Sequence, residues 1–219
     1  MKYIFIIAST ILLTCPLFGQ NQHIELDLNE LSFNLFSVKE RQVVKGGQKY
    51  YPYYFQGISY KRRFNTKNFV RSSFNYFQKL DEVSDQDTES VGNFSEIEFA
   101  VGYQREFLTQ WLRPYVAADL KILWGKSDQE NDDRAQPSFE NFKMNYFGVG
   151  VSPVAGILFK TPTPLSIAFE LSFDFLMVWE SGTRYYWEPD VVPINEPIED
   201  SGYVTRFNPV AGIFIILDF

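Results

Sequence analysis

The sequence predicts an all-β fold, an eight-stranded antiparallel up-and-down transmembrane β-barrel. Apolar and polar residues alternate with a period of two over most of the chain after residue 30, which is typical of strands with two unlike faces. Short and long connections alternate between these segments, as they do in barrels that cross a membrane. Aromatic residues make up 18% of the 219 residues, yet the mean hydropathy is only -0.18, so the chain is rich in apolar and polar side chains together.

The first 19 residues have the features of a secretory signal peptide. Lys2 precedes an apolar segment, 3–13, which is too short to span a bilayer, and Gly19 offers a small residue for cleavage. Lipidation at Cys15 is the alternative. The chain is therefore predicted to contain a signal peptide (1–19), an N-terminal extension (20–30) and an outer-membrane β-barrel (31–219).

Cleavage near Gly19 would leave an exported chain without cysteine, because Cys15 is the only one, and hence without a disulfide. Cleavage would also remove Lys2 and change the net charge from -7 to -8. Such an acidic chain is not expected to bind nucleic acid or to be drawn to anionic lipid by its charge.

Alternation justifies each predicted strand. In the first strand, Leu31 and Phe33 share one face. In the seventh, apolar residues occupy every second position from Leu165 to Trp179, a run longer than the 9–11 residues that a tilted strand needs to cross a bilayer. In order, the predicted strands are 31–38, 53–64, 69–78, 96–107, 115–126, 146–160, 165–180 and 203–219.

The connections predict which ends of the strands face which compartment. Those at 65–68, 108–113 and 161–164 are short and hairpin-like. The other four are long and mostly acidic. Membrane barrels have short periplasmic turns and long outside loops, so we expect both chain ends on the periplasmic side and long acidic loops outside.

The polar faces of these strands carry equal numbers of positive and negative residues. An eight-stranded barrel is only wide enough for side chains to fill it, and an unpaired buried charge costs several kcal/mol. A balanced set is therefore expected to form an ion-paired interior. Its members are Lys61, Arg71, Glu98, Asp119, Lys121, Glu170, Asp174 and Arg206.

The apolar faces carry aromatic residues near the strand ends: Tyr60, Tyr76, Tyr103, Trp124 and Trp179. Aromatic rings at these positions fit the girdles that flank the hydrocarbon layer. The alternative is a soluble periplasmic ligand-binding barrel, in which the same rings would form the core.

The C-terminal sequence GIFIILDF carries a resemblance to a known family. Gly212 is followed by apolar residues at alternate positions, Ile213, Ile215 and Leu217, and then by Phe219. This ending is similar to the assembly signal of the small eight-stranded outer-membrane barrels, the OmpA/OmpX-type, porin-like family. The resemblance covers about residues 30–219. It implies contact with outer-membrane lipid and recognition by the barrel-assembly machinery.

No catalytic site or cofactor is predicted. The single histidine, His23, precedes the first strand and would lie on the periplasmic side, far from an outer-leaflet substrate. Asp85, Asp87, Glu89 and Glu96 have part of a calcium-loop spacing, but Ser90 replaces the required glycine. We interpret this stretch as a solvated loop without a metal.

The last predicted loop contains Tyr185, Tyr186 and Trp187. These rings could bind a ligand or partner, or they could rest on the outer interface. We interpret the protein as a non-enzymatic barrel with structural or interaction roles and an envelope partner that the sequence does not identify. A PorT-like barrel serving protein secretion is the other membrane-bound alternative.

The sequence PVAGI occurs at 153–157 and again at 209–213. In both copies the proline, alanine and isoleucine are expected to face lipid, and the valine and glycine to face inward. Proline lacks the N–H that a non-edge strand uses, so we expect a β-bulge at Pro153 and at Pro209.

Overall fold

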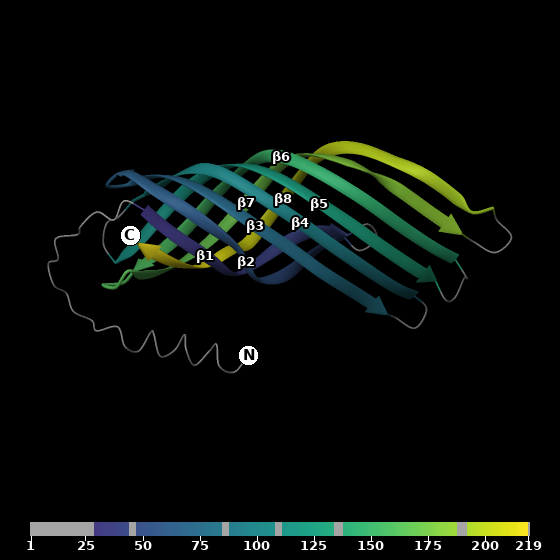
Figure 1. Ribbon diagram of the computed structural model, residues 1–219, viewed down its shortest axis with the longest axis horizontal. Helices are drawn as coiled ribbons and strands as arrows, with labels where there is room; N and C mark the ends of the chain where they lie inside the picture. The colour runs from purple at the N-terminus through teal and green to yellow at the C-terminus, as the bar shows by residue number, and fades with distance from the viewer. Residues whose placement is uncertain are drawn as a thin grey trace.

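The computed structural model describes residues 29–43, 47–84, 88–107, 111–133, 138–187 and 192–218. They form a closed antiparallel barrel in which neighbours in sequence are neighbours in space and β1 pairs with β8 (Figure 1). The predicted fold is confirmed. Its strands are β1 Asn29–Val43, β2 Gly47–Asn65, β3 Asn68–Ser84, β4 Thr88–Glu106, β5 Leu112–Asp133, β6 Ser138–Lys160, β7 Leu165–Trp187 and β8 Ile194–Asp218.

Some predictions fall outside the described residues. These are the signal peptide, Cys15, His23 and Phe219. Within the described ranges, no helix is long and apolar enough to cross a membrane.

The predicted long loops are mostly strand, and this part of the prediction is wrong. Residues 88–95 and 127–133, for example, belong to β4 and β5 and pair with each other from Thr88 and Asp133 inward. An antiparallel ladder is held by backbone hydrogen bonds, so it continues in water after the apolar pattern has ended. In Figure 1 these extensions lie at the end of the barrel away from the C-terminus.

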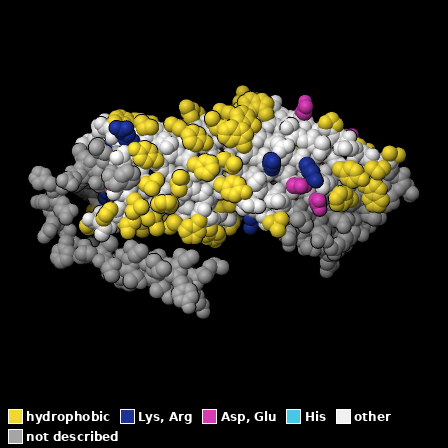
Figure 2. Space-filling model, viewed as in Figure 1, with side chains coloured by type: hydrophobic (Ala, Val, Ile, Leu, Met, Phe, Trp, Pro, Cys, Tyr) yellow, Lys and Arg dark blue, Asp and Glu magenta, His cyan; other side chains and the backbone are white. Residues whose placement is uncertain are grey.

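The outside of the barrel is apolar over the part nearer the short turns. Lipid-facing residues such as Leu120, Phe169 and Phe175 are 68%, 45% and 47% exposed, whereas charged side chains on the other face are buried. Figure 2 shows a band of apolar side chains from the end where β8 finishes to the middle of the barrel, with charges mainly beyond it. This distribution is the reverse of a soluble barrel and fits one surrounded by lipid.

Both predicted girdles contain the expected rings on the outer face. Near the short turns, the hydroxyls of Tyr60 and Tyr103 donate hydrogen bonds to Asn29 and Asn68, each at 2.6 Å. At the other boundary lies a row of aromatic side chains interrupted by one isoleucine, which we call the aromatic row. In strand register its members are Tyr76, Ile97, Trp124, Phe147 and Trp179.

The hairpin of β1 and β2 separates from its neighbours near this outer boundary. Pairing of β2 with β3 reaches only Gly57 and Asn75, and pairing of β1 with β8 reaches only Val38 and Val210. Beyond these points β1 and β2 pair with each other as far as Val43. We call residues 39–43 and 47–56 the outer hairpin.

The other six strands continue outward as one sheet. We call its outer part the protruding sheet: residues 78–84, 88–95, 126–133, 138–145, 181–187 and 194–205.

The two PVAGI copies differ in the structure. The register shifts between Glu170 and Ser172 opposite Pro209, which confirms a bulge there. At Pro153 the ladder keeps its register on both sides, so the predicted bulge is absent. The register shift also turns Ala211 toward the interior, where it lines a small cavity, rather than toward lipid as predicted.

Candidate functional site

The centre of the barrel is occupied by an arginine with two carboxylate partners. The Arg71 guanidinium donates two hydrogen bonds to Glu170, at 2.8 and 3.0 Å, and its Nε lies 3.2 Å from Asp119. The Tyr115 hydroxyl donates to the same Glu170 oxygen at 2.7 Å. Two other strands, β5 and β7, thus meet β3 at one guanidinium, whose fork suits a carboxylate. We call these four residues the Arg71 cluster.

A second cluster lies one layer further out. Lys121 Nζ is 2.8 Å from Asp174 and 3.9 Å from Glu98, and Lys39 forms an ion pair with Glu98. Ser152 donates a hydrogen bond to Asp174 at 2.6 Å. All the charged groups of this Lys121 cluster are buried, so their mutual contacts replace water.

A third interior pair, further out than the Lys121 cluster, joins β8 to β4. Arg206 Nη1 lies 3.2 Å from Glu96, and the Tyr146 hydroxyl donates to Glu96 at 2.9 Å. Glu96 was the last residue of the partial calcium-loop spacing, but it faces inward. Asp85 and Asp87 lie outside the described residues. In the described part of the chain, no group of three or more potential ligands could hold a metal ion.

Seven of the eight residues of the predicted interior set are buried. The eighth, Arg206, is part of the same network through Glu96. Lys61 is 2% exposed, and its ammonium lies 5.1 Å from the Tyr115 ring centroid. Between the clusters is a cavity of about 50 Å³, which is room for a water or two.

Sequence reasoning missed several inward charges at the end of the barrel that carries the short turns. Arg63 lies 3.6 Å from Glu30, and Arg113 lies 3.5 Å from Glu106. The alternation could have found Arg63 and Glu106, because each shares its face with an interior charge already chosen. Lys39 could not have been found in this way, because the register shifts between Asn34 and Phe36.

The predicted loop rings lie in strand β7, so the placement of Tyr185, Tyr186 and Trp187 in a loop is wrong. Tyr185 and Trp187 alternate with Tyr186 and therefore point to the opposite face. Tyr185 packs on Phe139 with ring centroids 6.2 Å apart. The three rings therefore do not form one contiguous surface.

The predicted assembly signal, as far as the structure describes it, forms the last residues of β8. Ile213, Ile215 and Leu217 lie on the outer face and pair with β1 and β7. Gly212 is buried, and a Cβ there would collide with the Phe214 ring.

The outer hairpin is held by side chains. Lys39 reaches inward to Glu98, and Tyr53 meets the Phe77 ring edge-on at 5.1 Å. The Phe207 N–H, which has no β1 strand partner, donates to Glu40 at 2.7 Å. These contacts hold the base of the outer hairpin against the neighbouring strands without a backbone ladder, and none of them involves residues 194–205 of β8.

No family model and no curated protein matches the chain. A similar solved structure is Ail, the attachment invasion locus protein of Yersinia pestis, at 13% identity and a TM-score of 0.41. The match covers 88% of this chain and 99% of that one.

The assignment to a membrane follows from the chain's own geometry. A closed barrel pairs its strand backbones without an edge, and this one has an apolar outside and a charged inside. Barrels of this construction are outer-membrane proteins. The chain has the architecture of a small eight-stranded outer-membrane β-barrel.

Proposed function

We propose that this protein is a non-enzymatic outer-membrane barrel that binds another protein through its protruding sheet. The filled interior supports this role over transport. Its charged groups contact one another across the lumen, and the central cavity has a volume of about 50 Å³. Eight strands leave no room for both these side chains and a wide channel. Purified barrels in planar bilayers should therefore show no large steady pore.

The observation that favours partner binding is the free outer edge of β8. Residues 194–205 pair with β7 on one side, whereas the described pairing with β1 ends at Val210. A free strand edge can accept a strand from another protein. Tyr203 on this stretch is 89% exposed, a large ring that lies open to solvent.

The charges on this edge indicate the kind of partner. Glu196, Glu199 and Asp200 are exposed there, and Pro197 interrupts the row of N–H donors. Acidic residues and proline on an edge discourage pairing between identical copies. We infer that the partner is a different protein with a basic strand or loop, because opposite charges promote encounter and set register.

Photo-crosslinking tests this proposal. A crosslinker at Tyr203 should capture a specific envelope or extracellular protein, and the double variant Glu199→Lys/Asp200→Lys should lose most of that product. A crosslinker at the exposed Glu130 on β5 is the matched control. Identical products from both positions, or no loss in the double variant, would refute the proposal. Capture of a secretion-machine component would favour the PorT-like alternative.

A further inference from the structure

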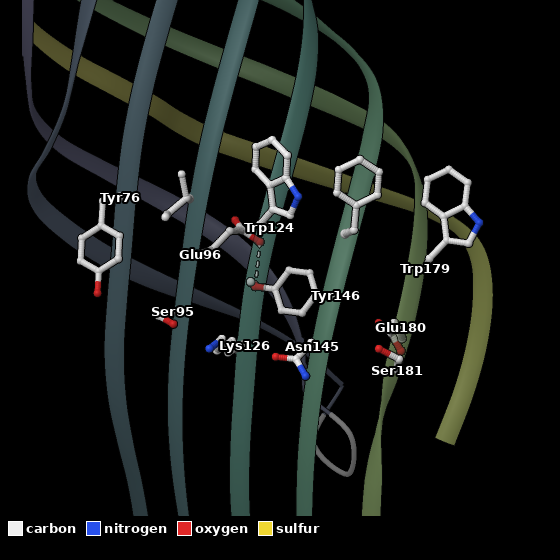
Figure 3. A pocket seen from close by; sticks show the side chains of 13 residues that line it. Tyr76, Ser95, Glu96, Trp124, Lys126, Asn145, Tyr146, Trp179, Glu180 and Ser181 are labelled. Atoms are coloured by element: carbon white, nitrogen blue, oxygen red, sulfur yellow. Dashed lines mark hydrogen bonds between the residues drawn. The ribbon is translucent and has the colours of Figure 1, made fainter. Parts of the chain in front are cut away.

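A groove crosses the outside of the barrel directly beyond the aromatic row. Its volume is about 410 Å³, within the range of small-molecule sites. The row beyond the groove is polar, and in strand order its members are Ser95, Lys126, Asn145 and Ser181. Figure 3 shows these side chains on one side of the groove and Tyr76, Trp124 and Trp179 on the other.

The groove exists because the residues between the two rows place no side chain on the outer face. Glu96, Gly125, Tyr146 and Glu180 are register neighbours. Three of them belong to the inward face and Gly125 has no side chain, so only backbone forms the floor. Glu96 hydrogen-bonds with Tyr146 on the lumen side (Figure 3) and is paired with Arg206. Its negative charge is thus balanced from within.

One wall of the groove is an apolar ledge. Phe147 lies between the two tryptophans, with ring centroids 5.4 Å from Trp124 and 5.7 Å from Trp179. Trp124 and Trp179 are 49% and 44% exposed. A continuous row of half-exposed rings offers flat apolar area to a hydrocarbon chain.

The opposite wall can donate hydrogen bonds. Lys126 supplies an ammonium, Asn145 an amide, and the two serines hydroxyl groups. Within the described part of the chain Lys126 has no ion pair, in contrast to Lys143, which lies 3.9 Å from Asp128. Glu180, at one end of the groove, is half-buried on the inward face. The wall therefore presents one available positive charge among neutral donors.

We propose that this groove binds a phosphate-bearing lipid of the outer leaflet. The phosphate would lie on Lys126 and its neighbouring donors, and the first part of an acyl chain would lie along Trp124 and Phe147. The position supports a lipid, because aromatic rings mark the headgroup level of a membrane barrel. A free phosphate would use only the polar wall. This proposal is independent of the protein partner at β8.

The test uses the folded, purified barrel and two probes that differ by one group: monophosphorylated lipid A and its dephosphorylated form. Native mass spectrometry in neutral detergent gives the relative affinity of each. We expect the phosphorylated form to bind about tenfold more tightly, the contribution of a charge-assisted hydrogen bond. Lys126→Ala should abolish that preference, and Lys143→Ala should keep it.

A second pair of variants tests the apolar wall. Trp124→Ala should weaken both probes by a similar factor, whereas Trp111→Ala, on another exposed ring near the short turns, should weaken neither. Heat-dependent mobility on gels verifies that each variant is folded. Equal affinity for both probes, or a Lys126→Ala variant that keeps the preference, would overturn the proposal. Competition by millimolar inorganic phosphate would instead assign the polar wall to a free ion.

Discussion

The same strands pass through two surroundings, and they obey different rules in each. In the membrane-spanning part, Arg71 Nη1 lies 2.8 Å from Glu170 Oε1, and the two side chains are 7% and 4% exposed. In the protruding sheet, Lys143 Nζ lies 3.9 Å from Asp128 Oδ2, and the two side chains are 63% and 49% exposed. The backbone ladder is continuous through both parts. Lipid outside and a narrow lumen inside thus require apolar side chains on one face of a strand and paired charges on the other. The backbone ladder forms without either surrounding.

The largest difference between the two parts should come from removing a carboxylate. Glu170→Ala takes both hydrogen bonds from Arg71 and one from Tyr115. We expect the free energy of unfolding to fall by about 3 kcal/mol, the lower end for breaking a buried pair, because Asp119 still contacts Arg71. Urea unfolding in detergent micelles measures this.

Glu130→Ala is the matched change in the protruding sheet. Glu130 is exposed and accepts one hydrogen bond from Asn141 at 3.0 Å, so its loss should change stability by less than about 0.5 kcal/mol. Equal losses for the two variants would contradict the distinction between the two parts.

A charge on the lipid-facing surface should have the next largest effect. Leu120 is near the middle of the lipid-facing run of β5 and is 68% exposed. Leu120→Arg should cost roughly 2 kcal/mol, since arginine near the bilayer midplane costs about 2–4 kcal/mol on a barrel. The measurement is the unfolding midpoint in lipid vesicles.

Tyr203→Arg provides the control, because Tyr203 is even more exposed but lies in the protruding sheet. It should leave that midpoint unchanged. If both arginine variants unfold at the wild-type midpoint, Leu120 does not contact lipid.

The smallest effect should come from adding one methyl group inside the barrel. A Cβ at Gly156 would collide with the ring of Tyr115, whose hydroxyl is bonded to Glu170. Gly156→Ala should destabilise the barrel by about 1 kcal/mol, as overpacking does. A Cβ at Gly202 would meet no atom within 4 Å, so Gly202→Ala should be neutral. Thermal unfolding of the pair, followed by gel mobility, decides between these outcomes.

The sequence was most informative where lipid constrains it. Period-two alternation identified all eight strands and the direction of Arg71 and Glu170, because a strand between lipid and a packed lumen has no other pattern available. It failed in the protruding sheet, where the predicted loop containing Tyr185 is strand. Around Tyr185 the side chains on both faces of β7 are exposed or half-buried, so no pattern distinguishes strand from loop there.

Local irregularities were the other limit. Bulges displace the register near Phe36 and Pro209, and Phe55 adopts a positive φ of 51°, which is uncommon for a bulky residue. Period-two alternation cannot be followed across such points, so it could not predict that Lys39 and Ala211 face the interior. The groove beside Trp124 could not be predicted either, because it depends on which residues of five strands, β3 to β7, become register neighbours.

The short ladder between β1 and β8 has a consequence for the timing of assembly. Glu30 pairs with Asp218, so this joint cannot form until nearly the whole barrel sequence has been made. Joining distant segments is slow, and an unjoined strand edge can recruit the wrong neighbour. Because the outer hairpin pairs only with itself, closure requires alignment of residues 30–38 alone. The pairing of the two ends of the barrel, a long-range step, therefore has only a short stretch of register to align.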